Sequence, residues 1–331
     1  MTGVSAGTWY WFLIHVDKEV SHGNGAMRRV GLVAFRGPLS WGSAFFQRLP
    51  SMFSALSPCR LQSLPPQLSA CPSLKVAYLL LGNTNIMPRA ICAVHHQLTS
   101  DQFSEHSVLL SVQDSTGFQA VKAGSDRHFQ HSTLAVTESG ATLGLLDQRW
   151  YERVEPLANE TRGQRAARWR ESCVWSDAAD AIGSAPEGTR FIHVADRGAD
   201  DLPFMANCEA NGHGFVIRAQ HDRRLQDGTD KLWQTLQHQP GVGSRTVEVG
   251  TQRYPKGQLA KRGRKATVSV RYRQVTLDQP TRSSNNSPAR TVNAVYLQET
   301  EPPDDVEPID WMLLTSESVA SADDAHRTID R

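Results

Sequence analysis

The chain has 331 residues, a length that allows about two domains and a sizeable hydrophobic core. Its formal net charge is only +1, so the overall charge balance neither favours nor excludes nucleic acid as a partner. The five cysteines are scattered without a C-x-x-C pair, which argues against a disulfide framework or a zinc site and favours the reducing cytoplasm. No apolar stretch reaches the length of a membrane span, and we expect a cytoplasmic protein without a membrane partner.

The first third of the chain gives a weak structural signal. Residues 1–74 are rich in glycine, serine and proline and lack apolar periodicity, so we expect an irregular, degenerate N-terminal region. Residues 75–106 have apolar side chains at helical spacing, which predicts a helical lead-in.

A mixed sheet with flanking helices is predicted for residues 107–226. The expected strands are residues 107–113, 132–137, 141–147, 190–195 and 214–219, and the expected helices are residues 168–182 and 202–210. Three successive strands followed by helix, strand, helix and strand are typical of an α/β (α+β) fold with helices on the faces of its sheet.

The texture of the sequence changes after residue 226. Three half-exposed strands are expected at residues 244–250, 266–272 and 291–297, so residues 227–305 are interpreted as a β-rich insertion. Residues 306–331 return to the core, with a buried strand at 310–316 and a helix from residue 320 onward. Ser321 is its expected cap, with Asp323 and Asp324 near its positive end. The chain ends inside this helix, which would be unusual for a complete domain.

Two aspartates follow predicted buried strands. Asp114 comes after SVLLSVQ, and Asp196 comes after RFIHVA. Carboxylates at the ends of adjacent strands face a common crevice and suit divalent metals such as Mg²⁺ or Mn²⁺. Two such ions about 3.5–4 Å apart can activate water and stabilise the leaving oxygen in phosphodiester cleavage. The alternative is ordinary turn or cap chemistry, for which aspartate is equally well suited.

Five segments occur in a fixed order along residues 75–331 and together make a specific signal. They are VLLSVQDST, HSTLAVT, GLLDQRWYER, HVADRGADDLPFMANCEANGHGFVIRAQHDR and IDWMLLTSESV. The first and fourth resemble the two aspartate segments of DDE transposases of the insertion-sequence-four group, the type carried by transposon five. The second and third resemble the block between them, and the last resembles the W-x-L-L-T-[ST]-E-x-V segment of that family.

The resemblance implies a ribonuclease-H-like core that cuts transposon ends by two-metal hydrolysis, with Mg²⁺ or Mn²⁺, and joins them to a target. Asp114 and Asp196 match the first two catalytic aspartates and metal ligands. Trp311 matches the tryptophan on which a flipped base stacks, although an aromatic residue that simply begins a buried strand is an equal alternative. The implied partners are double-stranded DNA and a second subunit, in a homodimer or a mixed dimer with intact transposase.

The sequence departs from the family at three places. Arg197 matches the family's DREAD block, but Gly198 stands where that block has Glu. The family's next helix carries Y-x-x-R-x-x-x-E, whose Glu is the third metal ligand, whereas this chain ends at IDR. Glu317 matches a different Glu of the motif, so no third ligand is nominated. The N-terminal segment DKEVSHGNGAMRRVGLVAF resembles the family's DNA-end-binding domain only weakly. We therefore expect a truncated copy that is inactive alone.

Basic residues gather where DNA contact would be expected. They are Arg197, Arg218, Arg223 and Arg224 around the second aspartate, and Lys261, Arg262, Arg264 and Lys265 in the insertion. A local cluster of one sign can neutralise phosphates and release counterions, whereas the alternative is an ordinary solvated loop.

Three other functions remain open at this point. The chain could be a non-catalytic DNA-binding remnant that inhibits intact transposase, a metal-dependent nuclease of the same fold, or a metal hydrolase that does not act on nucleic acid. DNA affinity with a steep salt dependence would exclude the last, and strand joining would separate a transposase from a nuclease.

Overall fold

The computed structural model divides the chain into two units, residues 1–101 and 102–331, and each is treated by itself. The residues that the structure describes are 10–20, 27–37, 88–118, 128–153, 159–161, 163–164, 168–226, 228, 230–250, 252–253, 259–261, 263–278, 288–304 and 306–331. Among them, no helix combines the length and the apolar character that crossing a membrane requires.

The N-terminal unit contains an antiparallel hairpin and a helix. Strands β1 (Tyr10–Val20) and β2 (Met27–Gly37) pair along their whole length, a feature that the sequence did not predict because neither strand alternates polar and apolar residues. The predicted helical lead-in is confirmed for α4 (Pro88–Ser100), where proline occupies the first helical position and its missing N–H costs nothing. Residues 75–87 lie outside the described residues.

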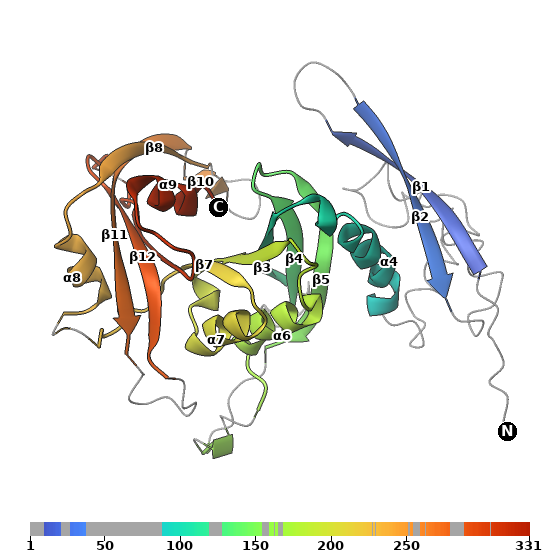
Figure 1. Cartoon of the computed structure of the whole chain (residues 1–331), viewed down its shortest axis with the longest axis horizontal. Coiled ribbons are helices and arrows are strands. Elements are labelled where there is room, and N and C mark those ends of the chain that lie inside the picture. The colour runs from blue at the N-terminus through green and yellow to red at the C-terminus, as the bar shows by residue number, and fades with distance from the viewer. Residues whose placement is uncertain are drawn as a thin grey trace. The chain divides into compact units, whose positions relative to one another are not determined.

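The second unit is built on one nine-stranded mixed sheet with the order β5-β4-β3-β6-β7-β13-β12-β11-β8 (Figure 1). The strands are β3 (Val108–Phe118), β4 (His128–Thr137), β5 (Thr142–Glu152), β6 (Arg190–Ala195), β7 (Gly214–Arg218), β8 (Gly243–Val249), β11 (Arg264–Leu277), β12 (Arg290–Glu299) and β13 (Asp310–Thr315). Only the β3–β6 and β6–β7 pairs of this sheet are parallel. The mixed α/β class predicted from the sequence is confirmed.

Short helices and one small ribbon complete this unit. They are η3 (Phe103–Glu105), α6 (Cys173–Ile182), η4 (Arg197–Ala199), α7 (Leu202–Ala210), α8 (Leu232–Gln237), α9 (Ala322–Asp330) and the ribbon of β9 (Gln252–Arg253) and β10 (Leu259–Lys261). The Ser321 cap is confirmed, because its hydroxyl accepts from the Asp324 N–H while the Asp324 carboxylate accepts from the Ser321 N–H.

Several elements differ from the sequence prediction. Helix α6 begins at Cys173 rather than Arg168, because Arg168 is paired with Glu160 and the following residues form a turn. Strand β3 continues to Phe118, because its pairing with β4 extends beyond its pairing with β6. Helix α8 was not predicted, since six residues are too few to show helical periodicity.

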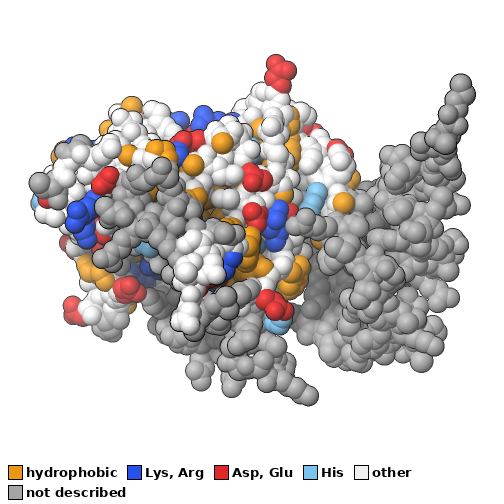
Figure 2. All heavy atoms as spheres, turned by 90° about the horizontal axis from the view of Figure 1, so that it is seen from below, with side chains coloured by type: hydrophobic (Ala, Val, Ile, Leu, Met, Phe, Trp, Pro, Cys, Tyr) orange, Lys and Arg blue, Asp and Glu red, His pale blue; other side chains and the backbone are white. Residues whose placement is uncertain are grey.

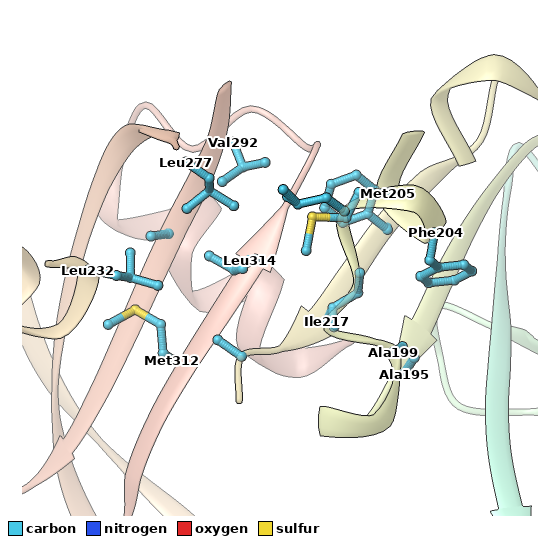
Figure 3. Close-up of a cluster of buried hydrophobic side chains, with 14 of the residues drawn as sticks. Ala195, Ala199, Phe204, Met205, Ile217, Leu232, Leu277, Val292, Met312 and Leu314 are labelled. Atoms are coloured by element: carbon cyan, nitrogen blue, oxygen red, sulfur yellow. The ribbon is translucent and has the colours of Figure 1, made fainter. Parts of the chain in front are cut away.

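Strands β8, β11 and β12 of residues 227–305 belong to the central sheet, whereas β9 and β10 pair only with each other. Strand β13 pairs with β7 on one side and with β12 on the other, so it joins the two halves. Figure 3 shows the resulting shared core, in which Leu314 of β13 lies between Leu232 and Ile217, and Met312 lies beside Leu232. Both halves of the sheet are therefore expected to unfold together.

The helices α6 and α7 lie side by side on one face of the sheet (Figure 1). Their side chains pack on alternate strand residues, including Ala195 and Ile217, which form the covered face. We call the opposite face of β5, β4, β3, β6 and β7 the open face. Its apolar residues include the buried Ile192 and Val216 with the half-buried Val112 and Val194 beside them.

Candidate metal and nucleic-acid site

Asp114 and Asp196 lie at the same level on neighbouring parallel strands. Gln113 of β3 pairs with Ala195 of β6, so the two aspartates are the next residue of each strand, and both are exposed. Neighbouring strands lie about 4.8 Å apart, and strand alternation puts Asp114 on the open face, whereas Asp196 lies just past the end of β6. Strands β3 and β6 are neighbours, as predicted, but Asp114 does not follow β3: it lies inside the strand, opposite Ser132 of β4. A metal shared by the two carboxylates stays a prediction.

Asp196 also has the capping role that the sequence left open. Its Oδ1 accepts a hydrogen bond of 2.8 Å from the Gly198 N–H and so begins η4. A carboxylate has two oxygens and about four lone-pair sites, so this cap does not prevent metal ligation. It does fix the direction in which the carboxylate points.

Gly198 is required by the close approach of the Trp175 ring. A Cβ at this position would lie 2.8 Å from Trp175 Cζ2 and 3.0 Å from Asp196 Oδ1. The indole is buried in the main core, so it cannot move aside cheaply. The Glu that the DREAD block would place here does not fit this arrangement.

We expect Gly198→Ala to lower the free energy of unfolding by about 1–3 kcal/mol, because the added methyl overpacks the site. Urea denaturation of Gly163→Ala gives the matched control, since a Cβ there would meet nothing within 4 Å. Equal stability of the two variants would contradict the steric account.

A series of hydrogen-bonded side chains lies on the covered face of the sheet, next to Asp114 in sequence. Ser115 Oγ lies 2.8 Å from His131 Nδ1, and His131 Nε2 lies 3.0 Å from Gln113 Oε1. Gln113 Nε2 in turn lies 2.8 Å from His193 Nδ1, whose Nε2 is 3.0 Å from His213 Nδ1. The residues on both sides of Asp114 are thus anchored on the covered face, which holds its backbone in place.

The direction of these hydrogen bonds follows from Gln113. Its amide nitrogen can only donate, so His193 accepts at Nδ1 and donates from Nε2 to His213. Its amide oxygen can only accept, so His131 donates from Nε2, while its Nδ1 lies beside the Ser115 hydroxyl. His193 and His213 each accept a hydrogen bond at Nδ1 and are therefore neutral. Burial lowers the pKa of His131 to about 4 and that of His193 to about 3, and it also lowers the pKa of His213.

Arg218 and Trp311 form a stacked pair at the same edge of the sheet. Arg218 of β7 lies at the level of Asp196, and its guanidinium lies 4.5 Å from the centre of the Trp311 ring. Burial and the neighbouring Arg197 lower the pKa of Arg218. Because Arg218 covers one side of the indole, a base that stacks on Trp311 must use the other side or displace the guanidinium.

Arg223 is committed to the protein itself. Its guanidinium donates bonds of 2.7 Å to the carboxylate and the carbonyl of Asp200, and its side chain is only 11% exposed. Asp200 Oδ2 also accepts from the N–H groups of Gln220 and His221, at 2.7 and 2.8 Å. This geometry favours a structural role for Arg223 over the predicted DNA contact. Arg224 is exposed and remains a predicted contact.

The basic residues of the insertion are also partly engaged. Arg264 forms a two-pronged ion pair with Glu299, whose pKa is lowered by that pairing, so Arg264 is structural as well. Lys265 is exposed and lies 3.6 Å from Glu248. Lys261 belongs to β10, and Arg262 lies outside the described residues. On the face that Figure 2 shows, positive and negative side chains are interspersed rather than gathered into one field.

Glu317 lies at the other end of the sheet from the two aspartates. Its carboxylate pairs with Arg190 at 2.6 Å and with Arg331 at 3.2 Å. Arg190 begins β6, whereas Asp196 follows the end of the same strand, so about 20 Å of strand separates them. The prediction that Glu317 is not a third ligand agrees with this placement.

No known protein-family model matches the chain. In the part of the chain that the structure describes, no three His, Cys, Asp or Glu side chains come together as a metal-sized group. The sequence predicts a structural role for His131, His193 and His213, because they lack metal-ligand spacing, and their burial agrees with it. Their hydrogen bonds with Gln113 and Ser115 depend on strand register and were not predicted.

Proposed function

We propose that this chain is a DNA-binding protein of the DDE transposase type, with a ribonuclease-H-like core formed by β3 to β7 and a β-rich insertion at residues 227–305. The observation that carries the proposal is the equal level of Asp114 and Asp196 on parallel neighbouring strands. Arg197, Arg218 and Trp311 lie at the same edge and are suited to a phosphate backbone and a base.

The donor set fits one hard divalent cation. Asp114 and Asp196 offer exposed carboxylate oxygens, and Mg²⁺ in proteins commonly takes one or two carboxylates and keeps several waters. When bound, such a cation would supply Lewis-acid polarisation of a phosphoryl oxygen and a more acidic water. The aspartates would hold it, Gly198 would orient Asp196 through its N–H, and the cationic Arg218 would offset phosphate charge.

Charge balance argues against efficient cleavage by these residues alone. Two Mg²⁺ ions carry four positive charges, of which two aspartates offset half. A cation that lacks a ligand is misplaced as well as weakly held, and a displacement near 1 Å can cost about 100-fold in rate. We propose that the 331-residue chain binds DNA without cutting it at a useful rate.

We expect duplex DNA binding to weaken steeply with salt, and the triple variant Lys261→Ala, Arg262→Ala and Lys265→Ala to flatten that dependence by up to about 3 units of slope. Filter binding between roughly 50 and 200 mM salt measures it. Arg264 is left intact, because its loss would leave the buried carboxylate of Glu299 without its ion-pair partner. Arg327→Ala, on exposed α9, is the control. An unchanged slope in the triple variant would refute these contacts, and binding that ignores salt would refute the proposed function.

A further inference from the structure

An exposed tryptophan lies on the open face beside the two aspartates. Trp150 of β5 is opposite Gln130 of β4, and Gln130 is opposite Thr116 of β3. Asp114 belongs to the preceding same-face row, opposite Ser132. Since side chains alternate between faces, Trp150 shares a face with Asp114 and stands one row beyond it.

Trp311 stands in the same row on the other side of the aspartates. Leu313 pairs with Arg218, and the Ala219 N–H donates to the Met312 carbonyl at 2.7 Å. Trp311 is therefore one same-face position beyond the level of Arg218, just as Trp150 is one position beyond that of Asp114. The two indoles are 57% and 37% exposed, respectively.

Among the residues that the structure describes, the side chains between Trp150 and the aspartates are polar but uncharged. They are those of Thr116, Gln130, Ser132 and Gln148. The apolar residues of the open face, such as Val112, Val194 and Leu134, begin on the other side of the aspartate row. A docked protein helix would need those apolar rows, whereas amides and hydroxyls beside an indole suit flat rings with polar edges, which is the chemistry of nucleobases.

We propose that Trp150 is a second base-stacking platform, and that a single nucleic-acid strand crosses the open face from Trp150 to Trp311 over Asp114 and Asp196. The inference rests on the proposed function and adds to it a binding residue and a path for the strand. Five strand steps of about 4.8 Å separate β5 from β13, a span of about 24 Å. At a rise of about 3.4 Å, roughly seven stacked nucleotides cover that distance.

The path explains why the aspartates lie where they do. A strand held by an aromatic platform at each end must pass its backbone over the row between them, which contains Asp114, Asp196 and Arg218. Arg218 lies over the Trp311 ring, so one cation is already placed at the boundary between platform and backbone.

The test is the affinity of the full chain for a 20-nucleotide oligo(dT), measured by fluorescence anisotropy without divalent metal. Trp150→Ala should weaken binding about 5- to 150-fold, the range that loss of one stacked base produces, and Trp150→Phe should retain most of the affinity. Trp169→Ala is the matched control. It is 41% exposed, but it packs edge-on against Tyr151, whose side chain belongs to the covered face.

Each result separates the inference from the proposed function. If the wild-type chain binds DNA and Trp150→Ala binds oligo(dT) equally well, the strand path is wrong while the proposed function stands. If the wild-type chain binds neither single- nor double-stranded DNA, both the proposed function and the inference are refuted. If Trp150→Ala leaves oligo(dT) affinity intact but changes the sedimentation of the free protein, Trp150 belongs to a protein interface and the inference is overturned. Circular dichroism checks that each variant is folded.

Discussion

Replacing Asp200 with alanine is expected to lower the free energy of unfolding by about 3–5 kcal/mol, the cost of leaving a buried charge without its partner. The Asp200 side chain is fully buried and Arg223 is 11% exposed, so water cannot replace the lost carboxylate. The N–H groups of Gln220 and His221 would lose their acceptor as well. Urea denaturation measures the effect.

The matched control is Asp222→Ala, a few residues along the same loop. Asp222 is 44% exposed, its carboxylate lies 3.7 Å from Lys231 Nζ and accepts a hydrogen bond of 3.2 Å from the Trp233 N–H, and each of these exposed contacts contributes about 1 kcal/mol. Similar losses of stability in the two variants would show that the Asp200–Arg223 pair does not organise the loop after β7.

The stability of the chain is expected to fall as the pH drops from about 6.5 toward 4, through the buried histidines. The folded-state pKa values of His131 and His193, about 4 and 3, lie below the ordinary value of 6.5. Between these pH values the unfolded chain binds more protons than the folded chain. The free energy of unfolding therefore decreases as the pH falls. The stability that depends on neutral histidines is fully present above pH 6.5 and is lost as the pH falls toward the folded-state pKa values. For His131 alone it is on the order of 3 kcal/mol.

The variant His131→Gln tests this account. Glutamine keeps a donor and an acceptor for Gln113 and Ser115 but cannot be protonated in this range. The decline in stability between pH 6.5 and 4, followed by urea midpoints, should become shallower than in the wild-type chain. A decline of unchanged steepness would mean that other groups are responsible.

The core strands of the sheet were predictable because they are short apolar runs. The segments RFIHVA and GFVIR appear as β6 and β7 with almost the predicted bounds. The end of β3 was not predictable, because Asp114 to Phe118 are mostly polar and are held as a strand only by β4, which follows later in the chain. The place of β8, β11 and β12 in the central sheet depends on β13, which pairs on both sides.

The candidate site was predictable only in part, for a related reason. Asp114 and Asp196 could be found because each follows an apolar run, and strand ends meet at one edge of a sheet. Arg223 and Arg264 were assigned to DNA because their acidic partners, Asp200 and Glu299, are 23 and 35 residues away in sequence. The row shared by Trp150 and Trp311 follows from strand register, which composition and periodicity do not contain.

The central claim is that Asp114 and Asp196 together hold a divalent cation, and Mn²⁺ titration followed by electron paramagnetic resonance tests it most directly. The comparison uses the wild-type chain, Asp114→Asn, Asp196→Asn and the control Asp323→Asn, which changes an exposed aspartate on α9. We expect each of the first two variants to bind Mn²⁺ at least about tenfold more weakly, because each loses one anionic oxygen ligand, and the control to bind like the wild type. Equal Mn²⁺ affinity in all four proteins would contradict the account.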